Sequence, residues 1–362
     1  MVTLVTLVKF APLALFGIPF GGLPVKVPPR TLYIVGVLAM IVVNIAGLYL
    51  AVQGALTVLQ VMIVSFAGGV FWVLDFPVRR ALIGDSVAQS QLGQAMAVDT
   101  IANNGTRMLG PVAGGLLLQF VGLTGALLFA IATYLVCLWL TIRLGIGRSR
   151  IANDGGESIL SNLMQGIQLV RDNPLLQGLL MVTVVFNLFG FPLLSLVPVL
   201  GRDTLQLTPG AVGLLASMEG TGALLGSLFM LRFAAMRHYR KLYTGGLILY
   251  LTASGVYAWL GESVSVGVML VLAGMGSAIF AAMQTTLLIL NSPRAYRSRL
   301  FGLLSLSIGA GLLGFTFIGV LADLVGVRAA IFTGALLGLL STVVLCKKWP
   351  ALLSEQPEQA EQ

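Results

Sequence analysis

The sequence predicts an all-α membrane protein with about 11 transmembrane helices, arranged as two parallel repeats of five and six. Three observations lead to this fold class. Hydrophobic residues make up 57% of the 362 residues and charged residues only 9%, whereas a soluble domain carries about 25% charged residues. The apolar residues form runs of about 20, the length that crosses a bilayer as a helix. Short motifs also recur in the second half of the chain in the order of the first.

Eleven segments are long and apolar enough to span the membrane, and lipid offers their backbone groups no partner outside a helix. These spans are residues 3–22, 31–51, 54–74, 93–120, 122–142, 175–199, 209–231, 242–260, 265–289, 300–321 and 326–346. They form an N-terminal bundle (1–144) and a C-terminal bundle (175–346). The linker 145–174 is predicted to contain an amphipathic cytoplasmic helix from Ser158 to Val170. The tail 347–362 is rich in Gln and Glu and is predicted to be disordered.

Most of the 21 basic residues lie in loops on one side of the predicted bundle. The positive-inside rule makes that side cytoplasmic, so the C-terminus is expected in the cytoplasm. The net charge of +8 therefore reflects topology, and no nucleic-acid partner is expected. The expected location is the inner (plasma) membrane of the cell, which the chain would cross many times.

Two sets of residues recur in order, which indicates two similar halves that point the same way. The first set joins Arg30, Leu32, Tyr33 and Gly36 to Arg240, Leu242, Tyr243 and Gly246. The second joins Gly110, Gly115, Gly122 and Ala126 to Gly314, Gly319, Gly326 and Ala330. The first half lacks a counterpart of span 175–199. One N-terminal helix is therefore expected to be missing, through either a late start-site assignment or a truncation.

Three motifs resemble the major facilitator superfamily. The stretch Gly110 to Gly115 resembles the antiporter signature of its fifth helix. The stretch Asp75 to Asp85 resembles the connection between helices four and five in the branch of enterobactin-type siderophore exporters and macrolide-efflux-like proteins. Arg299 to Gly302, with Gly319 to Asp323, resembles that branch's eleventh helix. The resemblance implies a secondary transporter that exports a small amphipathic molecule, drug-like or siderophore-like, by proton-coupled alternating access.

One loop departs from the family pattern. The loop between the second and third helices usually carries an acid followed by paired basic residues. Here Val25 replaces the acid and Pro29 replaces a basic residue, within Gly22 to Arg30. In the family that acid belongs to a charge network that latches the two halves on the cytoplasmic side. The altered loop therefore puts in question whether the protein still alternates between the conformations of a transport cycle.

Two charged residues inside spans are the main site candidates, because a charge in lipid is costly and marks function by default. Glu219 is the candidate for proton coupling, and a structural hydrogen bond to a neighbouring helix is the alternative. Arg107 is a candidate to contact substrate, and pairing with an acid such as Asp99 is the alternative. Asn187 and Gln284 are candidates to line a cavity, although isolated polar residues in spans more often join helices.

Two further groups complete the candidate residues. Gly110, Pro111, Gly114 and Gly115 would form a closely packed helix, in which the proline frees a backbone carbonyl that a neighbouring helix or water must satisfy. Asp75, Arg79, Arg80 and Asp85 are expected to form a cytoplasmic charge cluster, with plain topology determinants as the alternative. No enzyme, cofactor or metal signature is present in the sequence.

The expected partners are therefore the lipid bilayer, a small-molecule substrate and protons. Two other functions stay open. A truncated member could fold without transporting, which the missing helix and the altered loop both favour. An importer of a small nutrient or siderophore would keep the fold and reverse the flux.

Overall fold

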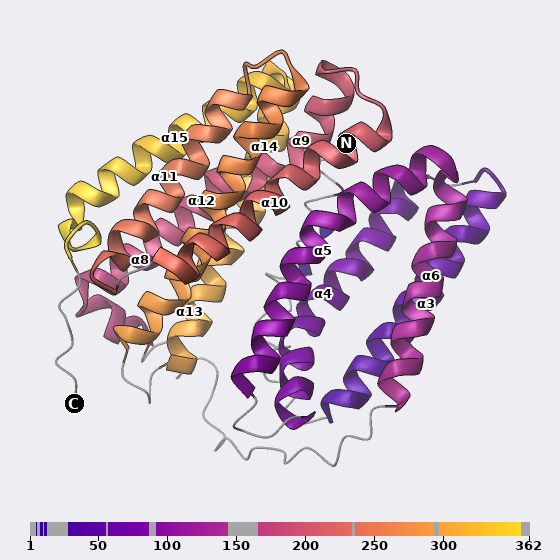
Figure 1. The fold of residues 1–362 in the computed structure, drawn as a ribbon, viewed down its shortest axis with the longest axis horizontal. Helices are drawn as coiled ribbons and strands as arrows, with labels where there is room; N and C mark the ends of the chain where they lie inside the picture. The colour runs from indigo at the N-terminus through magenta and orange to yellow at the C-terminus, as the bar shows by residue number, and fades with distance from the viewer. Residues whose placement is uncertain are drawn as a thin grey trace. The chain divides into compact units, whose positions relative to one another are not determined.

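The computed structural model describes residues 5, 8–9, 11–12, 28–55, 57–86, 92–143, 166–233, 236–292 and 297–355 (Figure 1). All regular structure in these residues is helical. Three predicted features lie wholly or mostly outside them: the span 3–22, the altered loop from Gly22 to Arg30, and the linker helix from Ser158 to Val170. Residues 166–171, at the end of the linker, are helical.

Eight helices in the described residues are long and apolar enough to cross a membrane. They are Arg30–Val52, Val58–Asp75, Gly122–Arg143, Pro174–Thr204, Pro209–Arg232, Ser263–Leu290, Gly302–Val325 and Val327–Lys348. The predicted spans 93–120 and 242–260 are also helical and correspond to α5 (Leu92–Phe120) and α11 (Tyr239–Tyr257). The predicted all-α membrane fold is therefore confirmed.

The chain divides into two compact units, each described here by itself. If residues 1 and 2 of the chain are left aside, the first unit comprises Thr3–Asn103 and Ala113–Gly156. The second comprises Glu157–Gln362 together with Asn104–Val112, the middle of α5. That short segment of α5 therefore belongs with the helices of the second half of the chain.

Aromatic side chains join three helices of the first unit. Its described helices are α3 (Pro29–Val52), α4 (Val58–Ser86), the two ends of α5, and α6 (Gly122–Arg143). The ring of Phe71 on α4 lies 6.0 Å from Tyr33 on α3 and 5.9 Å from Tyr134 on α6, measured between centroids. Gly36 leaves room for this contact, because a β-carbon built there would lie 3.0 Å from the Phe71 ring.

The second unit begins with an irregular helix rather than the uniform span predicted at 175–199. Asn173 caps its start, with Oδ1 accepting from the backbone N–H groups of Leu175 and Leu176, and Pro174 occupies the first position. Five segments then follow one another: α8 (Pro174–Val185), the π turn η2 (Phe186–Gly190), the 3-10 turn η3 (Phe191–Leu196), α9 (Val197–Val199) and the π turn η4 (Leu200–Thr204).

The remaining helices of the second unit pack around that segment. They are α10 (Pro209–Phe233), η5 (Met236–His238), α11, α12 (Ser263–Leu290), α13 (Arg297–Gly309), α14 (Gly311–Val325) and α15 (Val327–Lys348). The predicted single span 300–321 is thus two helices that break at Ala310. Just beyond the break, a β-carbon built at Gly314 would lie 2.7 Å from the carbonyl oxygen of Asn187 in η2. Glycine lets the two backbones approach closely here.

The structure corrects the prediction of a disordered tail as far as Glu355. After α15, the short helix η7 (Pro350–Leu352) places the side chain of Leu352 fully inside the unit, against Gly178 of α8. Trp349 Nε1 donates a hydrogen bond to Gln177 Oε1. Lys241 Nζ lies 2.9 Å from Glu355 Oε1, and this hydrogen bond holds the pKa of Glu355 below its ordinary value. Residues 349–355, named here the C-terminal strap, therefore dock on α8 and α11. Residues 356–362 lie outside the described part of the chain.

The arginine of the repeated motif makes a similar contact in each half of the chain. Arg30, at the start of α3, donates from Nη2 to the carbonyl oxygen of Ile142 near the end of α6. Arg240, at the start of α11, donates from Nη1 to the carbonyl oxygen of Ala351, just after α15. In both places the arginine joins the start of one helix to a backbone carbonyl at or just beyond the end of another.

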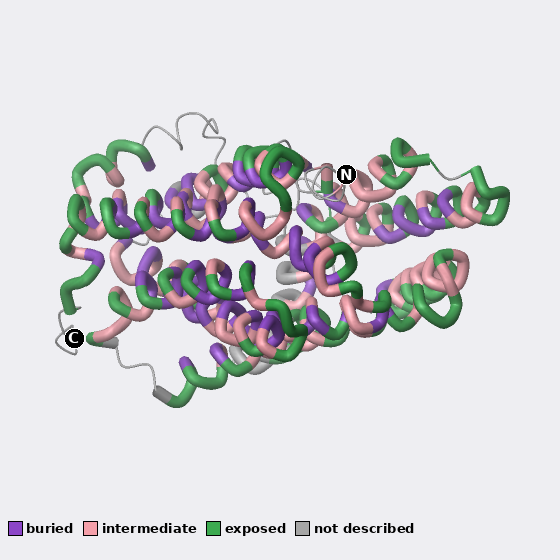
Figure 2. The backbone as a smooth tube through the Cα atoms, turned by 90° about the horizontal axis from the view of Figure 1, so that it is seen from above, coloured by how far each residue is buried: buried purple, intermediate pink, exposed green. Residues whose placement is uncertain are grey.

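Apolar side chains lie on the outside as well as the inside of the helices. Figure 2 shows buried and exposed positions alternating along them. Exposed large apolar residues include Phe120, Leu231 and Val264. A continuous apolar exterior of this kind belongs in lipid, because a soluble protein rarely exposes large contiguous apolar patches.

Candidate functional site

The two charged residues singled out by the sequence meet in the second unit. Glu219 lies on α10 and is only 4% exposed. Nη2 of Arg107 lies 2.8 Å from Oε1 and 3.0 Å from Oε2 of the Glu219 carboxylate. Arg107 belongs to the α5 segment that clusters with the second unit. A buried carboxylate is stabilised when it is both paired and hydrogen-bonded, and this one is held by a charge-assisted pair.

A third helix also contributes a polar group to this site. Ser277 Oγ, on α12, lies 3.0 Å from Glu219 Oε1 and 2.9 Å from the carbonyl oxygen of Gly274. Its single hydroxyl proton can be donated to either acceptor. The site therefore draws a cation from α5, a carboxylate from α10 and a hydroxyl from α12.

Glycines allow these helices to come close enough for the side chains to meet. A β-carbon built at Gly274 of α12 would collide with the backbone of Glu219. One built at Gly226 of α10 would lie 2.8 Å from the carbonyl oxygen of Met275. Gly222 packs in the same way on Val271. These glycines serve close helix packing, as small residues commonly do between membrane helices.

Pro111 opens the backbone of α5 beside the pair. It lies inside the helix and has no N–H group, so it cannot bond to the carbonyl of Arg107 four residues earlier. A β-carbon built at Gly220 of α10 would lie 2.7 Å from that carbonyl oxygen. The next N–H, that of Val112, donates to Ser217 Oγ on α10 at 3.1 Å. The α5 backbone on both sides of Pro111 therefore lies against α10, and the expectation that a neighbouring helix or water satisfies the freed carbonyl stays a prediction.

The other antiporter-motif residues are placed as follows. Gly115 is buried. At Gly110 and Gly114, a built β-carbon meets no atom of the described residues within 4 Å. The close approach expected at those two glycines stays a prediction.

Asn187 and Gln284 meet at a second polar cluster, around Thr183 of α8. Gln284 Nε2 donates to Thr183 Oγ1 at 2.8 Å, and Asn187 Nδ2 donates to the carbonyl oxygen of Thr183 at 2.9 Å. Tyr243 OH lies 3.1 Å from Thr183 Oγ1 and donates to the carbonyl oxygen of Leu179. The sequence does not single out Thr183, whereas Tyr243 belongs to the repeated motif. Asn187 and Gln284, the two candidates to line a cavity, therefore both donate hydrogen bonds inside the second unit.

The acidic and basic residues near the end of α4 form part of the predicted charge cluster. Arg79 Nε donates to Asp75 Oδ2 at 3.1 Å, and the guanidinium also pairs with Asp99 of α5, which is buried. Asp99, considered above as a partner for Arg107, is thus paired with Arg79 instead. Arg80 and Asp85 lie on α4, and their side chains are outside the described part of the chain.

Comparison with known proteins decides the family. A family model described as "Transmembrane secretion effector", within the major facilitator group, matches residues 1–360. The chain belongs to this transmembrane secretion effector family. Among its relatives, Macrolide efflux protein A of Streptococcus pyogenes is 24% identical over 342 residues, which are 91% of this chain and 82% of that protein. A multi-drug resistance efflux pump PmrA homolog of Lactococcus lactis is 23% identical over 283 residues, covering 74% and 69% of the two chains.

Solved structures of transporters share the fold of this chain. The nucleoside transporter NupG superposes with a TM-score of 0.72 at 11% identity, over 98% of this chain and 90% of that one. At this identity the likeness shows the fold alone. The protein is therefore a multi-pass membrane transporter with the major facilitator fold, and not an enzyme.

Proposed function

We propose that this transporter exports a small amphipathic molecule in exchange for protons, with Glu219 as the residue that binds and releases the proton. The single observation that supports this is the pairing of Glu219 with Arg107 and Ser277. The Glu219 side chain is 5% exposed, while that of Arg107 is 41% exposed. Because Glu219 is buried and its partner Arg107 is accessible, a change in the protonation of Glu219 can be passed through Arg107 to an event on the accessible side.

The coupling step follows from the charges. Protonation of Glu219 removes the negative charge that holds Arg107 and weakens their charge-assisted hydrogen bonds. The guanidinium of Arg107 then lacks its anionic partner and is free to pair with another group on its accessible side. Proton binding thereby favours a different arrangement of α5 and α10, which is how a ligand shifts a conformational equilibrium. Release of the proton restores the pair.

Direction and substrate class are proposed from the relatives. Macrolide efflux protein A and the multi-drug resistance efflux pump homolog are both named for export of drug-like molecules. We carry export over to this chain at the level of a small amphipathic compound. The proposed cycle exposes the site alternately to the two sides, with the C-terminus in the cytoplasm, as the distribution of basic loops indicates.

The test measures efflux of a fluorescent dye and of a macrolide from cells that express the chain. Glu219→Gln keeps the size of the side chain and removes its ability to take up a proton. Glu262→Gln is the matched control, because Glu262 is exposed at the start of α12 and far from any span centre. Membrane abundance of each variant is measured alongside.

The expected result is efflux that a proton uncoupler abolishes in wild type and Glu262→Gln, and that is absent in Glu219→Gln at equal abundance. Uncoupler-sensitive efflux that survives in Glu219→Gln would overturn the role of Glu219 and keep the export. Accumulation driven inward would support the importer. An absence of flux across a broad substrate panel would support a folded member that does not transport.

A further inference from the structure

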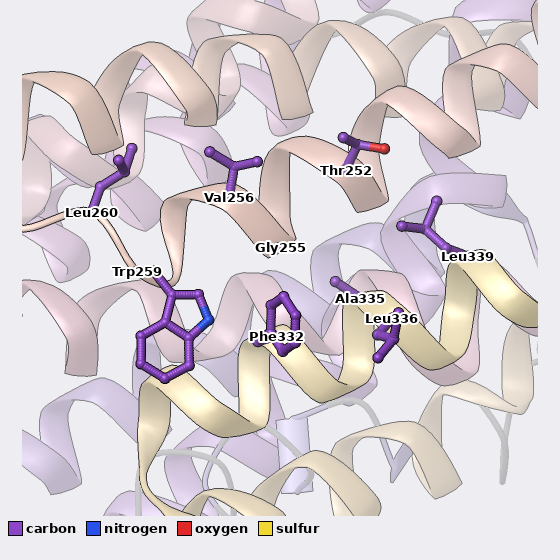
Figure 3. Close-up of a pocket in the computed structure, with 9 residues that line it drawn as sticks. All are labelled: Thr252, Gly255, Val256, Trp259, Leu260, Phe332, Ala335, Leu336 and Leu339. Carbon is purple, nitrogen blue, oxygen red and sulfur yellow. The ribbon is translucent and has the colours of Figure 1, made fainter.

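A groove runs between α11 and α15 on the outside of the second unit. Its volume is about 480 Å³, and it is open along one side (Figure 3). The lining is apolar except for the hydroxyl of Thr252 and the indole N–H of Trp259; the residues are Thr252, Gly255, Val256, Trp259, Leu260, Phe332, Ala335, Leu336 and Leu339. Trp259, Phe332 and Leu336 are exposed, so the groove faces the medium around the helices, which is lipid for a membrane transporter.

Small residues create this groove. Gly255 and Ala335 form its floor, because a β-carbon built at Gly255 would meet the β-carbon of Ala335 at 3.5 Å. Trp259 and Phe332 stand at one end as a T-shaped pair with ring centroids 6.1 Å apart. A larger side chain at Gly255 would extend towards Ala335 and Phe332, because the built β-carbon lies 3.5 Å from the first and 4.0 Å from the second.

The end beside Trp259 and Leu260 carries a positive charge. Arg328 lies four residues before Phe332 on α15, and residues at that spacing share one face of a helix. Its Nη2 makes a long hydrogen bond of 3.4 Å to the carbonyl oxygen of Leu260. Among the described residues, its Nε has no hydrogen-bond partner. The guanidinium is thus incompletely satisfied at the end of an apolar groove.

We propose that this groove binds one phospholipid of the bilayer, with an acyl chain between α11 and α15 and the phosphate on Arg328. The charge pattern matches that ligand: an apolar channel ends at a cation, as a phospholipid's chain ends at an anionic phosphate. Arginine pairs with phosphate through charge-assisted hydrogen bonds. Trp259, at the end of α11, is the residue type that marks the level of the headgroups. The site is independent of the proposed proton coupling.

The experiment measures lipid bound to the purified full-length chain by native mass spectrometry, with phosphatidylglycerol added to the detergent. Gly255→Leu fills the groove. Gly245→Leu is its control, because Gly245 lies on the same helix and a β-carbon there meets nothing within 4 Å. Arg328→Gln removes the cation and Arg328→Lys keeps it. Diacylglycerol with the same chains tests the need for phosphate.

Wild type and Gly245→Leu are expected to bind one phosphatidylglycerol tightly, and Gly255→Leu to lose that binding. Arg328→Gln is expected to weaken it about tenfold, the loss of roughly 1.4 kcal/mol expected for one charge-assisted contact, while Arg328→Lys retains most of it. Diacylglycerol is expected to bind weakly and equally to wild type and Arg328→Gln.

Two results would overturn the proposal. Equal binding to Gly255→Leu and Gly245→Leu would mean that the groove is not the site. Equal binding of phosphatidylglycerol and diacylglycerol to wild type would mean an apolar groove that any chain, including detergent, can occupy. A photoreactive acyl chain gives a second readout that does not depend on variants. It should cross-link to residues 252–260 and 332–339, and cross-links confined to other helices would contradict the site.

Discussion

Nη2 of Arg107 contacts both carboxylate oxygens of Glu219, at 2.8 and 3.0 Å, across 112 positions of the sequence. This relationship joins α5 to α10 in the second unit, where Glu219 is buried. Arg202 and Asp203 form a second pair with two similar hydrogen bonds, yet both of those side chains are exposed. The two pairs allow the effect of burial to be measured within one protein.

Removal of Arg107 should therefore destabilise the protein, because it leaves the buried Glu219 without its cation. Arg107 is itself 41% exposed, so Arg107→Met should cost less than breaking a fully buried pair, about 1.5–3 kcal/mol, as for a hydrogen bond to a charged group. Glu219→Gln alone should cost less, and the double variant should recover part of the loss, because neither charge then remains alone. Thermal unfolding in detergent measures all three. The corresponding variants of Arg202 and Asp203 should change stability much less, because exposed ion pairs contribute little, so equal effects at both pairs would contradict the assignment.

A methyl group at Gly274 should force α12 away from α10. A β-carbon there collides with the backbone of Glu219, and overpacking of this kind costs about 1–3 kcal/mol. Gly245→Ala, at an open position of α11, should instead stabilise by up to about 1 kcal/mol, because alanine favours the helix over glycine. The two substitutions are chemically identical and opposite in expected sign. The melting temperatures of Gly274→Ala and Gly245→Ala test this directly.

The hydroxyl group of Thr183 should contribute more to the stability of the protein than the shape of the side chain does. Thr183→Val keeps the volume and leaves Gln284 Nε2 without its acceptor inside the unit, which costs about 1–3 kcal/mol. Thr316→Val provides the comparison, since Thr316 is exposed and bonds only to Leu312 of its own helix. That variant should stay within about 0.5 kcal/mol of wild type. A negligible loss in Thr183→Val would show that the cluster around Thr183 is dispensable for stability.

The C-terminal strap should open when its buried leucine is shortened. Leu352 is fully buried, whereas its neighbour Leu353 is half exposed. Truncation of a buried leucine to alanine costs about 2–5 kcal/mol. Here the loss cannot exceed the free energy that docks the strap, because the strap then detaches. Leu352→Ala should therefore speed trypsin cleavage after Lys347 and Lys348, which are exposed but lie in the last helical turn of α15, while Leu353→Ala should be cleaved at the wild-type rate. Identical cleavage of the two variants would contradict the docked strap.

The helices and the two charged residues were predictable because lipid imposes strong local rules. A run of about 20 apolar residues must be helical there, and an ionisable residue inside it stands out by composition alone. The partner of Arg107 was not predictable, because the sequence does not fix which helices are neighbours. Asp99, closer along the chain, pairs with Arg79 instead. Spatial proximity, rather than sequence spacing, selected Glu219.

Two structural departures could not be read from hydropathy. The strap docks through Leu352 and Trp349, but the apolar run 349–353 that contains them is too short to indicate a membrane span. The irregular turns between α8 and η4 have the same apolar composition as a regular helix. In both places, contacts with other helices decide the conformation, and composition does not reveal them.

The π turns η2 and η4 have a consequence for how relatives must be aligned. A π turn closes its hydrogen bonds over one residue more than an α turn. A homologous chain with one residue fewer at Phe186–Gly190 could form a continuous α-helix there. If the two chains are then matched position by position without a gap, each later side chain is compared with one that lies about 100° away around the helix. Single-residue gaps are therefore expected at these two turns, and a gapless alignment through them would equate side chains that face different directions.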